Sequence, residues 1–386
     1  MKISSRRKKQ WDVAPDNRAW IEVNLPALKH NVQELSRLLP DQSELMAVVK
    51  ANAYGHGDIA IALELMRSGV KSFAVATLKE GIHLRQQGIK GDILILGYTN
   101  PKYSSQLAKY NLIQTVIDYP YAQMLNQSSK PIRVHIKIDT GMNRLGVYAE
   151  NLSEIEGIFL CTNLKVDGIF SHLSTSDSVA GENALFTEQQ IQRFYQLTDS
   201  LKAKGYYLGK LHIQSSYGIL NYPDLAYDYA RVGIALYGVL SAHDPTHTSV
   251  HLKPVLSLKA RIATIKEIEP GDAISYGRQF KATSNMKIAT ITIGYADGIP
   301  RMLNENSDAY VLVHAEKAPI IGRICMDQLI IDISHIKEAK QNDVVTLIGV
   351  DGDKQIRCED IAQQNGTISN EILSRLGSRL EYVYLK

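Results

Sequence analysis

Polar side chains that are able to act in catalysis or ligand binding recur at the ends of short apolar runs in the first two thirds of the chain. Lys50 ends one such run, and Arg144, His172 and Ser216 follow three others. Arg231 lies within a further run. These residue types hold phosphate groups or carry a covalently bound cofactor when they share one surface. The elements that carry them must therefore bring them together.

Eight β-branched or apolar runs alternate with helical patterns in this part of the chain. The predicted strands cover residues 45–49, 73–75, 92–96, 114–117, 133–138, 165–170, 210–214 and 229–232. Helical patterns separate them, as at 59–66, 78–87 and 188–203. A doubly wound sheet also alternates, but eight units favour closure, so we predict an α/β fold with a (β/α)8 barrel. Barrel active sites lie at the C-terminal strand ends, where the residues above fall.

The pattern changes after about residue 243, where β runs separated by turn signals replace the alternation. The predicted strands cover 256–268, 288–293, 310–313, 320–324, 329–333 and 344–348, and one helix covers 370–376. These runs predict a second, mostly-β domain. We therefore expect a basic tail at 1–18, a barrel domain at 19–242 and a C-terminal β domain at 243–386.

Composition excludes several classes of protein. Of 386 residues, 45% are hydrophobic and 22% charged, which is ordinary for a globular chain and excludes a disordered or fibrous one. A net charge of +3 is too weak to argue for nucleic-acid binding. The three cysteines Cys161, Cys325 and Cys358 are too few and too far apart for a disulfide framework. A reducing, cytoplasmic location fits this cysteine use.

Neither a metal site nor a membrane span is expected. His243, His247 and His251 stand four residues apart, a spacing that would align them on a helix. Pro245 favours a linker instead, so we predict no metal site. No apolar run approaches the length needed to span a bilayer.

The first nine residues hold five basic side chains, Lys2 and residues 6–9, and no acidic one. Because the whole chain has 43 basic and 40 acidic residues, the remainder is slightly acidic. A solvated terminus accounts for this tail. It also fits the cytoplasmic flank of a membrane segment that is absent from the chain, because such flanks are rich in Lys and Arg.

The strand-end residues indicate a particular cofactor. Ser216, Gly233 and Ile234 follow or end the last two barrel strands, where barrels often bind phosphate through hydroxyl and backbone N–H donors. Lys50 would lie across the barrel mouth and could hold an aldehyde. A lysine opposite a phosphate site suggests pyridoxal phosphate, although a lysine at a strand end is more commonly a surface residue.

Several motifs together resemble the alanine racemases from about residue 19 to the C-terminus. The motif at 48–57, VVKANAYGHG, is similar to the pyridoxal-phosphate attachment motif of that family. The others are KIDTGMNRLG at 137–146, RVGIALYG at 231–238, SYG at 275–277, GYADG at 294–298 and CMD at 325–327. Their order and spacing match throughout.

The resemblance implies a role for each matched residue. Lys50 would carry the cofactor and act as base on one face of the substrate Cα, and Tyr276 of the other subunit would act on the opposite face. The shared site implies a homodimer. Further positions would hold the cofactor (Tyr54, His172, Ser216, Arg231, Gly233, Ile234), bind substrate (Arg144, Met326, Asn370) or support the site (Lys137, Asp327, Tyr295). An access channel would be lined by Tyr295 as well and by five others: Arg301, His212, Asp177, Arg323 and Ile368.

Two of these implied roles have chemical consequences. An always-charged Arg231 facing the pyridine nitrogen would make the ring a weaker electron sink and suppress decarboxylation and transamination. Lys137 matches a position that carries a carbamate in some members, where it orients Arg144.

One position departs from the alanine racemase pattern. Asn370 stands where those enzymes usually carry a tyrosine that closes the pocket over the substrate methyl group. An amide adds a hydrogen-bond donor and an acceptor, and a site that pairs a hydroxyl favours serine over alanine. The same replacement resembles the one that the membrane-bound serine/alanine racemases of glycopeptide resistance show at this position. We therefore expect a serine racemase with alanine as second substrate, and a housekeeping alanine racemase is the alternative.

Two other classes fit less well. Non-catalytic pyridoxal-phosphate carriers end near the barrel, whereas this chain continues into a β domain. Basic amino-acid decarboxylases need a carboxylate for the pyridine nitrogen and a glycine-rich phosphate loop. In this chain Arg231 stands at the position of that carboxylate, and no glycine-rich loop follows His172.

Overall fold

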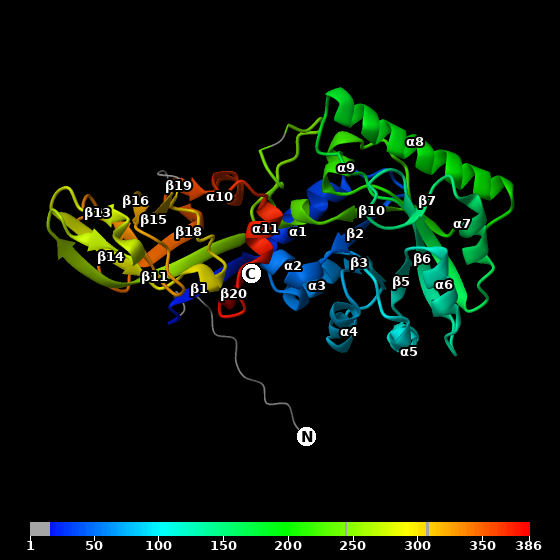
Figure 1. Ribbon diagram of the computed structural model, residues 1–386, viewed down its shortest axis with the longest axis horizontal. Coiled ribbons are helices and arrows are strands. Elements are labelled where there is room, and N and C mark those ends of the chain that lie inside the picture. The colour runs from blue at the N-terminus through cyan, green and yellow to red at the C-terminus, as the bar shows by residue number, and fades with distance from the viewer. Residues whose placement is uncertain (1–15, 244, 306–308) are drawn as a thin grey trace, which may run out of the picture. The chain divides into compact units, whose positions relative to one another are not determined.

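A computed structural model describes residues 16–243, 245–305 and 309–386. The described chain divides into two compact units (Figure 1). One is built around residues 23–256 and also includes 357–376. The other is built around 257–356 and also includes residues 16–22 and 377–384 of the described chain.

The first unit is a closed barrel of eight parallel strands, which confirms the predicted fold class (Figure 1). The strands are β2 (Glu44–Val48), β3 (Ser72–Val75), β4 (Asp92–Ile95), β5 (Ile113–Val116), β6 (Ile132–Asp139), β8 (Leu164–Phe170), β9 (Lys210–His212) and β10 (Tyr229–Val232). Closure comes from two pairings, β5 with β6 and β10 with β2. Fully or nearly buried side chains such as Met46, Ala74 and Leu94 fill the interior.

Helices between the strands begin at local capping signals. The helix α4 (Leu78–Gln86) starts with a capping box, in which Thr77 accepts from the Glu80 amide and Glu80 accepts from the Thr77 amide. The helix α6 (Tyr119–Asn126) starts at Asp118, whose side chain accepts from the Tyr121 amide. The remaining barrel helices are α1 (Leu25–Ser36), α2 (Lys50–Gly55), α3 (Asp58–Arg67), α5 (Ser104–Lys109), α7 (Leu152–Phe159), α8 (Gly181–Ala203) and α9 (Ser216–Asn221).

The second unit is mostly β, as predicted. Its main sheet has nine strands in the order β19-β18-β15-β16-β17-β14-β11-β1-β20. Their bounds are β1 (Ala19–Asn24), β11 (Leu256–Ile268), β14 (Met286–Ile291), β15 (Tyr310–Val313), β16 (Glu316–Ile321), β17 (Leu329–Asp332), β18 (Val344–Asp351), β19 (Lys354–Ile356) and β20 (Glu381–Leu385).

The sequence analysis did not predict three strands of this sheet, β1, β19 and β20. It placed residue 19, where β1 begins, at the start of the barrel. Instead, β1 pairs between β11 and β20. Trp20 is 1% exposed, and the Arg261 guanidinium lies 5.3 Å from its ring centroid. Such pairing between the start and the end of a chain leaves no signal in local periodicity.

The predicted domain limits differ from the compact units in several places. Residues 245–256, predicted as part of the β domain, group with the barrel. Arg18, the last residue of the predicted tail, forms an ion pair with Asp297 in the β unit. The helices α10 (Cys358–Gln364) and α11 (Ser369–Ser374), predicted as part of the β domain, group with the barrel. The five basic residues at the start of the tail, Lys2 and residues 6–9, lie outside the described residues.

No helix in the described ranges is long and apolar enough to cross a membrane.

Candidate active site

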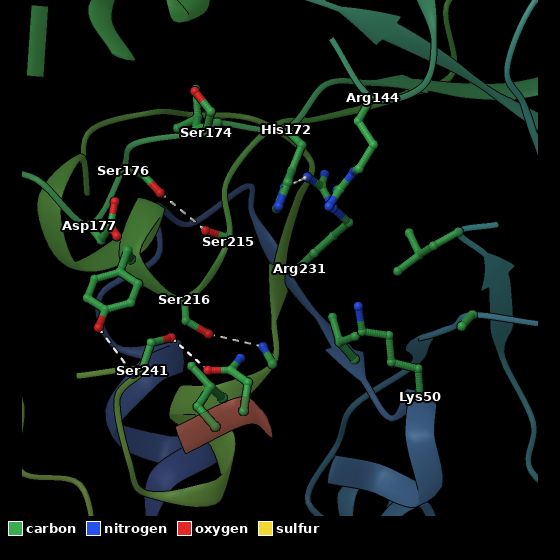
Figure 2. A pocket seen from close by; sticks show the side chains of 18 of the residues that line it. Lys50, Arg144, His172, Ser174, Ser176, Asp177, Ser215, Ser216, Arg231 and Ser241 are labelled. Carbon is green, nitrogen blue, oxygen red and sulfur yellow. Dashed lines mark hydrogen bonds between the residues drawn. The ribbon is translucent and has the colours of Figure 1, made fainter. Parts of the chain in front are cut away.

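A cavity of about 590 Å³ opens in the barrel unit where several strands end (Figure 2). It is lined by predicted site residues, namely Lys50, Tyr54, Lys137, Arg144, His172, Ser216, Arg231, Gly233, Ile234 and Asn370. In Figure 2, Lys50, Arg144, His172 and Arg231 point toward its interior, and Ser216 and Ser241 lie along another wall. The barrel therefore brings together all the predicted site residues that belong to it.

Lys50 begins a left-handed turn at the end of β2. Residues Ala51 to Tyr54 have φ values of 51° to 54°, which cost L-residues roughly 1–2 kcal/mol each. Hydrogen bonds from the Ala53 amide to the Val49 carbonyl and from the Ala51 amide to Glu80 hold this turn. Strain concentrated in this turn is typical of a functional site.

The helix α11 packs directly on that turn. A Cβ at Gly55 would lie 2.2 Å from the Leu373 carbonyl oxygen, so only glycine allows this approach. The contact explains why residues 357–376 group with the barrel, and it brings Asn370 to the cavity that Lys50 lines.

The surroundings of Lys50 favour its neutral amine. Burial lowers the pKa of Lys50, and the positive charge of Arg144 lowers it further, whereas Glu80 opposes the shift. A neutral amine is the form that attacks a carbonyl or accepts a proton. Lys50 therefore has the properties of a nucleophile and a base.

Hydroxyl groups form a cup on the opposite wall. Ser216 Oγ accepts from the amides of Gly233 and Ala235, at 3.1 and 3.3 Å, which leaves its own proton free to donate. A Cβ at Gly233 would lie 2.6 Å from the Tyr54 hydroxyl, so the glycine admits that hydroxyl. Burial raises the pKa of Tyr54 to about 12, which keeps it a donor. The cup fits a phosphate group.

Arg231 lies at the centre of a buried polar chain. Its guanidinium donates to His212 Nδ1 at 2.6 Å and to His172 Nδ1 at 3.2 Å. His212 Nε2 in turn lies 2.9 Å from His135 Nδ1. Because a guanidinium only donates, His212 must accept at Nδ1 and donate from Nε2 to His135. The three histidines hold the arginine in one position.

Arg231 is the only charged side chain in this hydrogen-bonded row of one arginine and three histidines. Burial lowers the pKa of Arg231 to about 9, so it remains protonated at neutral pH. Burial and the neighbouring arginine lower the pKa values of His172 and His212 well below the usual range. Burial lowers the pKa of His135 to about 4. All three imidazoles are neutral at pH 7.

His212 corrects one prediction. The resemblance placed it in an access channel, but its side chain is completely buried and stacks on Phe170 at 4.8 Å. A side chain between Arg231 and His135 cannot line an entrance, so that expectation is wrong. Asp177 and Ile368, from the same predicted set, do line the cavity.

Lys137 is a buried residue of the cavity wall. It donates to the Ile138 carbonyl at 2.5 Å. Burial, Arg231 and Arg144 lower its pKa to about 7, while Asp139 opposes them. A partly neutral amine agrees with the reactivity that carbamylation requires, and the modification itself stays a prediction.

The remaining predicted residues lie in the β unit. Tyr276 is 70% exposed and Met326 is 53% exposed. Backbone hydrogen bonds join residues 325 and 326 to Tyr295 and Ala296. Arg379 connects Asp327 to the fully buried Asp297 carboxylate, which also pairs with Arg18. The β unit thus presents an exposed tyrosine and a fixed loop around Met326.

Comparison with known proteins decides the family. Residues 23–241 match the family model for the N-terminal domain of alanine racemase, and 255–384 match the one for its C-terminal domain. The chain belongs to the alanine racemase family.

Relatives within this family carry different substrate names. The chain is 43% identical over 381 residues to an "Amino-acid racemase" of Enterococcus faecalis, covering 98% of this chain and 53% of that protein. It is 40% identical over 382 residues to a "Serine/alanine racemase" of Enterococcus gallinarum, covering 97% and 53%. The chain therefore spans about half the length of these curated relatives.

A solved family structure matches both units of the chain. The alanine racemase of Clostridium difficile 630 has a TM-score of 0.88 at 35% identity, covering 96% of this chain and 97% of that one. Racemases of this family are isomerases that use pyridoxal 5'-phosphate, and the cavity offers what this cofactor needs. Lys50 would bind its aldehyde carbon, the cup of Tyr54 and Ser216 would hold its phosphate, and Arg231 would face its ring nitrogen.

Sequence reasoning missed two residues of the racemase site. Ser241 lines the cavity and hydrogen-bonds Asn370, and His135 ends the chain of histidines behind Arg231. The pairing of Ser241 with Asn370 joins residues 129 positions apart, which local patterns do not reveal. The one signal available in the sequence was His135 itself, which lies in the strand that leads into the KIDTGMNRLG motif.

The buried histidines His56 and His135 lead us to expect that acid lowers the stability of the barrel unit. Burial lowers the folded-state pKa values of His56 and His135 to about 4, whereas an unfolded histidine titrates near 6.5. The unfolded state binds more protons between these values, so the free energy of unfolding falls as pH drops from about 6.5 to 4. We expect about 3 kcal/mol for each histidine over this interval.

Urea unfolding as a function of pH measures this dependence. His56→Phe should reduce the slope between pH 6.5 and 4.5, and the matched variant His335→Phe, at an exposed site, should leave it unchanged. Equal slopes in wild type and His56→Phe would contradict the assignment.

Proposed function

We propose that this chain racemises serine, with alanine as a second substrate. The observation that carries the proposal is the Asn370 amide on the wall of the cavity that Lys50 lines. Its Oδ1 accepts from Ser241 Oγ at 2.8 Å. The name of the Enterococcus gallinarum relative supports the same pair of substrates.

The amide changes what the site recognises. A buried polar group that pairs with a substrate hydroxyl loses that partner when the hydroxyl is missing, which costs roughly 1–3 kcal/mol. An apolar wall barely separates serine from alanine. An amide at position 370 therefore raises the preference for serine relative to an aromatic ring there.

The proposed reaction uses two bases on opposite faces of the substrate Cα. Lys50 exchanges the proton on one face, and Tyr276 of the partner subunit exchanges it on the other. Arg144 and the Met326 amide of the partner bind the carboxylate. Bound pyridoxal phosphate supplies the electron sink that acidifies the Cα–H bond.

Arg231 restricts the outcome of the proposed reaction. Its guanidinium keeps its proton, so it would donate to the ring nitrogen of the bound cofactor without protonating it. The histidines behind it hold that donor in place. This arrangement favours return of a proton at Cα over decarboxylation or transamination.

The proposed role in the cell follows from the substrate. D-serine would enter modified peptidoglycan precursors in glycopeptide (vancomycin) resistance, and the racemase would act as a cytoplasmic homodimer. We further propose that the racemase is tethered to a membrane domain. If alanine is strongly preferred, the chain is a housekeeping alanine racemase that supplies D-alanine for peptidoglycan.

Asn370→Tyr tests the substrate assignment. We expect the ratio of kcat/KM for L-serine to that for L-alanine to fall by about 10- to 100-fold, because the ring removes the hydroxyl partner. Coupled assays of both D-products measure the ratio. Gln363→Tyr, at an exposed position of α10, is the matched control and should keep the wild-type ratio. An unchanged ratio in Asn370→Tyr would refute the role of the amide.

A further inference from the structure

Ser241 holds the amide that faces the cavity. We infer that Ser241 is a specificity-determining positioning residue, which fixes the orientation of the Asn370 amide so that its NH₂ group faces the substrate side chain. The inference rests on the proposed serine activity. It assigns the recognition of the hydroxyl to a pair of residues, not to Asn370 alone.

Three hydrogen bonds fix Ser241 itself. Its backbone amide donates to the Tyr217 hydroxyl at 3.1 Å. Its carbonyl accepts from the Ser369 amide at 2.9 Å. Its Oγ donates to Asn370 Oδ1 at 2.8 Å. Ser241 thus connects α9, which carries Tyr217, to α11, which carries Asn370 (Figure 2).

The two residues whose hydrogen bonds hold the Ser241 backbone are themselves buried. Tyr217 is 7% exposed and directly follows Ser216 of the phosphate cup. Ser369 is completely buried at the start of α11, the helix that packs on the turn of Lys50. Ser241 is therefore held by the same two helices that shape the cup and the Lys50 turn.

This contact assigns the two ends of the amide. With Oδ1 occupied by the Ser241 hydroxyl, the Nδ2 group keeps two N–H donors. No described protein group accepts a hydrogen bond from Nδ2. A ligand that offers a hydroxyl oxygen satisfies this donor, and a methyl group does not.

The contact also lowers the cost of recognition. An asparagine side chain that rotates freely must lose that freedom when it binds a substrate, whereas one already held by a neighbour does not. Removing the Ser241 hydroxyl should let the amide turn, so that serine loses more than alanine.

The test is a double-mutant cycle read as the serine-to-alanine ratio of kcat/KM. Ser241→Ala should lower the ratio by about 5-fold, as expected for one hydrogen bond worth about 1 kcal/mol. Ser241→Thr keeps the hydroxyl and should retain the ratio within about 2-fold. In an Asn370→Ala background, Ser241→Ala should have no further effect on it. Ser153→Ala, at an exposed site on α7, is the control.

The outcomes separate this inference from the proposed function. If Asn370→Ala lowers the ratio but Ser241→Ala does not, serine recognition stands and the role of Ser241 is overturned. The same conclusion follows if Ser241→Ala acts equally in the Asn370→Ala background, or if threonine fails to restore the ratio. If wild type does not racemise serine at all, the proposed function fails and the inference fails with it.

Discussion

Replacing Lys50 by alanine is expected to abolish racemisation, with a loss of at least about 10⁴-fold in kcat. Lys50 is the one lysine on the left-handed turn at the mouth of the barrel, and its lowered pKa favours the neutral amine. The variant should also lose the visible absorbance of lysine-bound pyridoxal phosphate. Both effects follow from one missing amine, which would otherwise attach the cofactor and exchange the Cα proton.

Two measurements make this result specific. Lys79→Ala, at an exposed position of the helix α4, should keep both the activity and the absorbance. Circular dichroism should confirm that Lys50→Ala remains folded, because Lys50 is only partly buried. Retention of the lysine-bound absorbance in Lys50→Ala would show that another lysine carries the cofactor.

Tyr276→Phe is expected to reduce racemisation by about 10²- to 10⁴-fold in both directions, because it removes one of the two proposed bases. The variant should still exchange the Cα proton of one enantiomer with deuterated water, since Lys50 serves that face. Exchange of the other enantiomer should be lost. Mass spectrometry of each recovered enantiomer measures this asymmetry, and equal exchange of both would contradict the two-base proposal.

A mixing experiment tests the proposed sharing of sites. If Tyr276 serves the partner's Lys50, a heterodimer of Lys50→Ala and Tyr276→Phe contains one site with both native residues. Random exchange of subunits should then restore up to about a quarter of the wild-type activity. No recovery after subunit exchange would place both residues in the site of one chain. Mixing Lys50→Ala with the double variant Lys50→Ala/Tyr276→Phe is the control, and it should restore no activity because neither subunit carries Lys50.

The amino-acid sequence determined the architecture of the barrel closely. All eight predicted strands occur, because buried parallel strands are short apolar runs that local composition reveals. The long strand β11 occupies the residues predicted, 256–268. Motifs such as VVKANAYGHG also identified residues that line the cavity, through their resemblance to the motifs of the alanine racemases. The structure adds that close contacts require glycine at Gly55 and Gly233.

Contacts between distant segments were decided only by the tertiary structure. The strand β1 joins the sheet of the β unit, and α11 packs on the turn of Lys50. His212 looked like a channel residue but is enclosed between Arg231 and His135. Side-chain periodicity specifies whether a residue is buried, not which distant residue it meets.

Asn370 illustrates both contributions. The sequence identified it as a departure from the alanine racemase pattern, because an amide stands where those enzymes usually carry an aromatic ring. It did not reveal Ser241, which lies 129 residues away and donates a hydrogen bond to that amide. Residue type fixes which hydrogen bonds a side chain is able to make, and only the folded chain fixes which of them form and which group remains for the ligand.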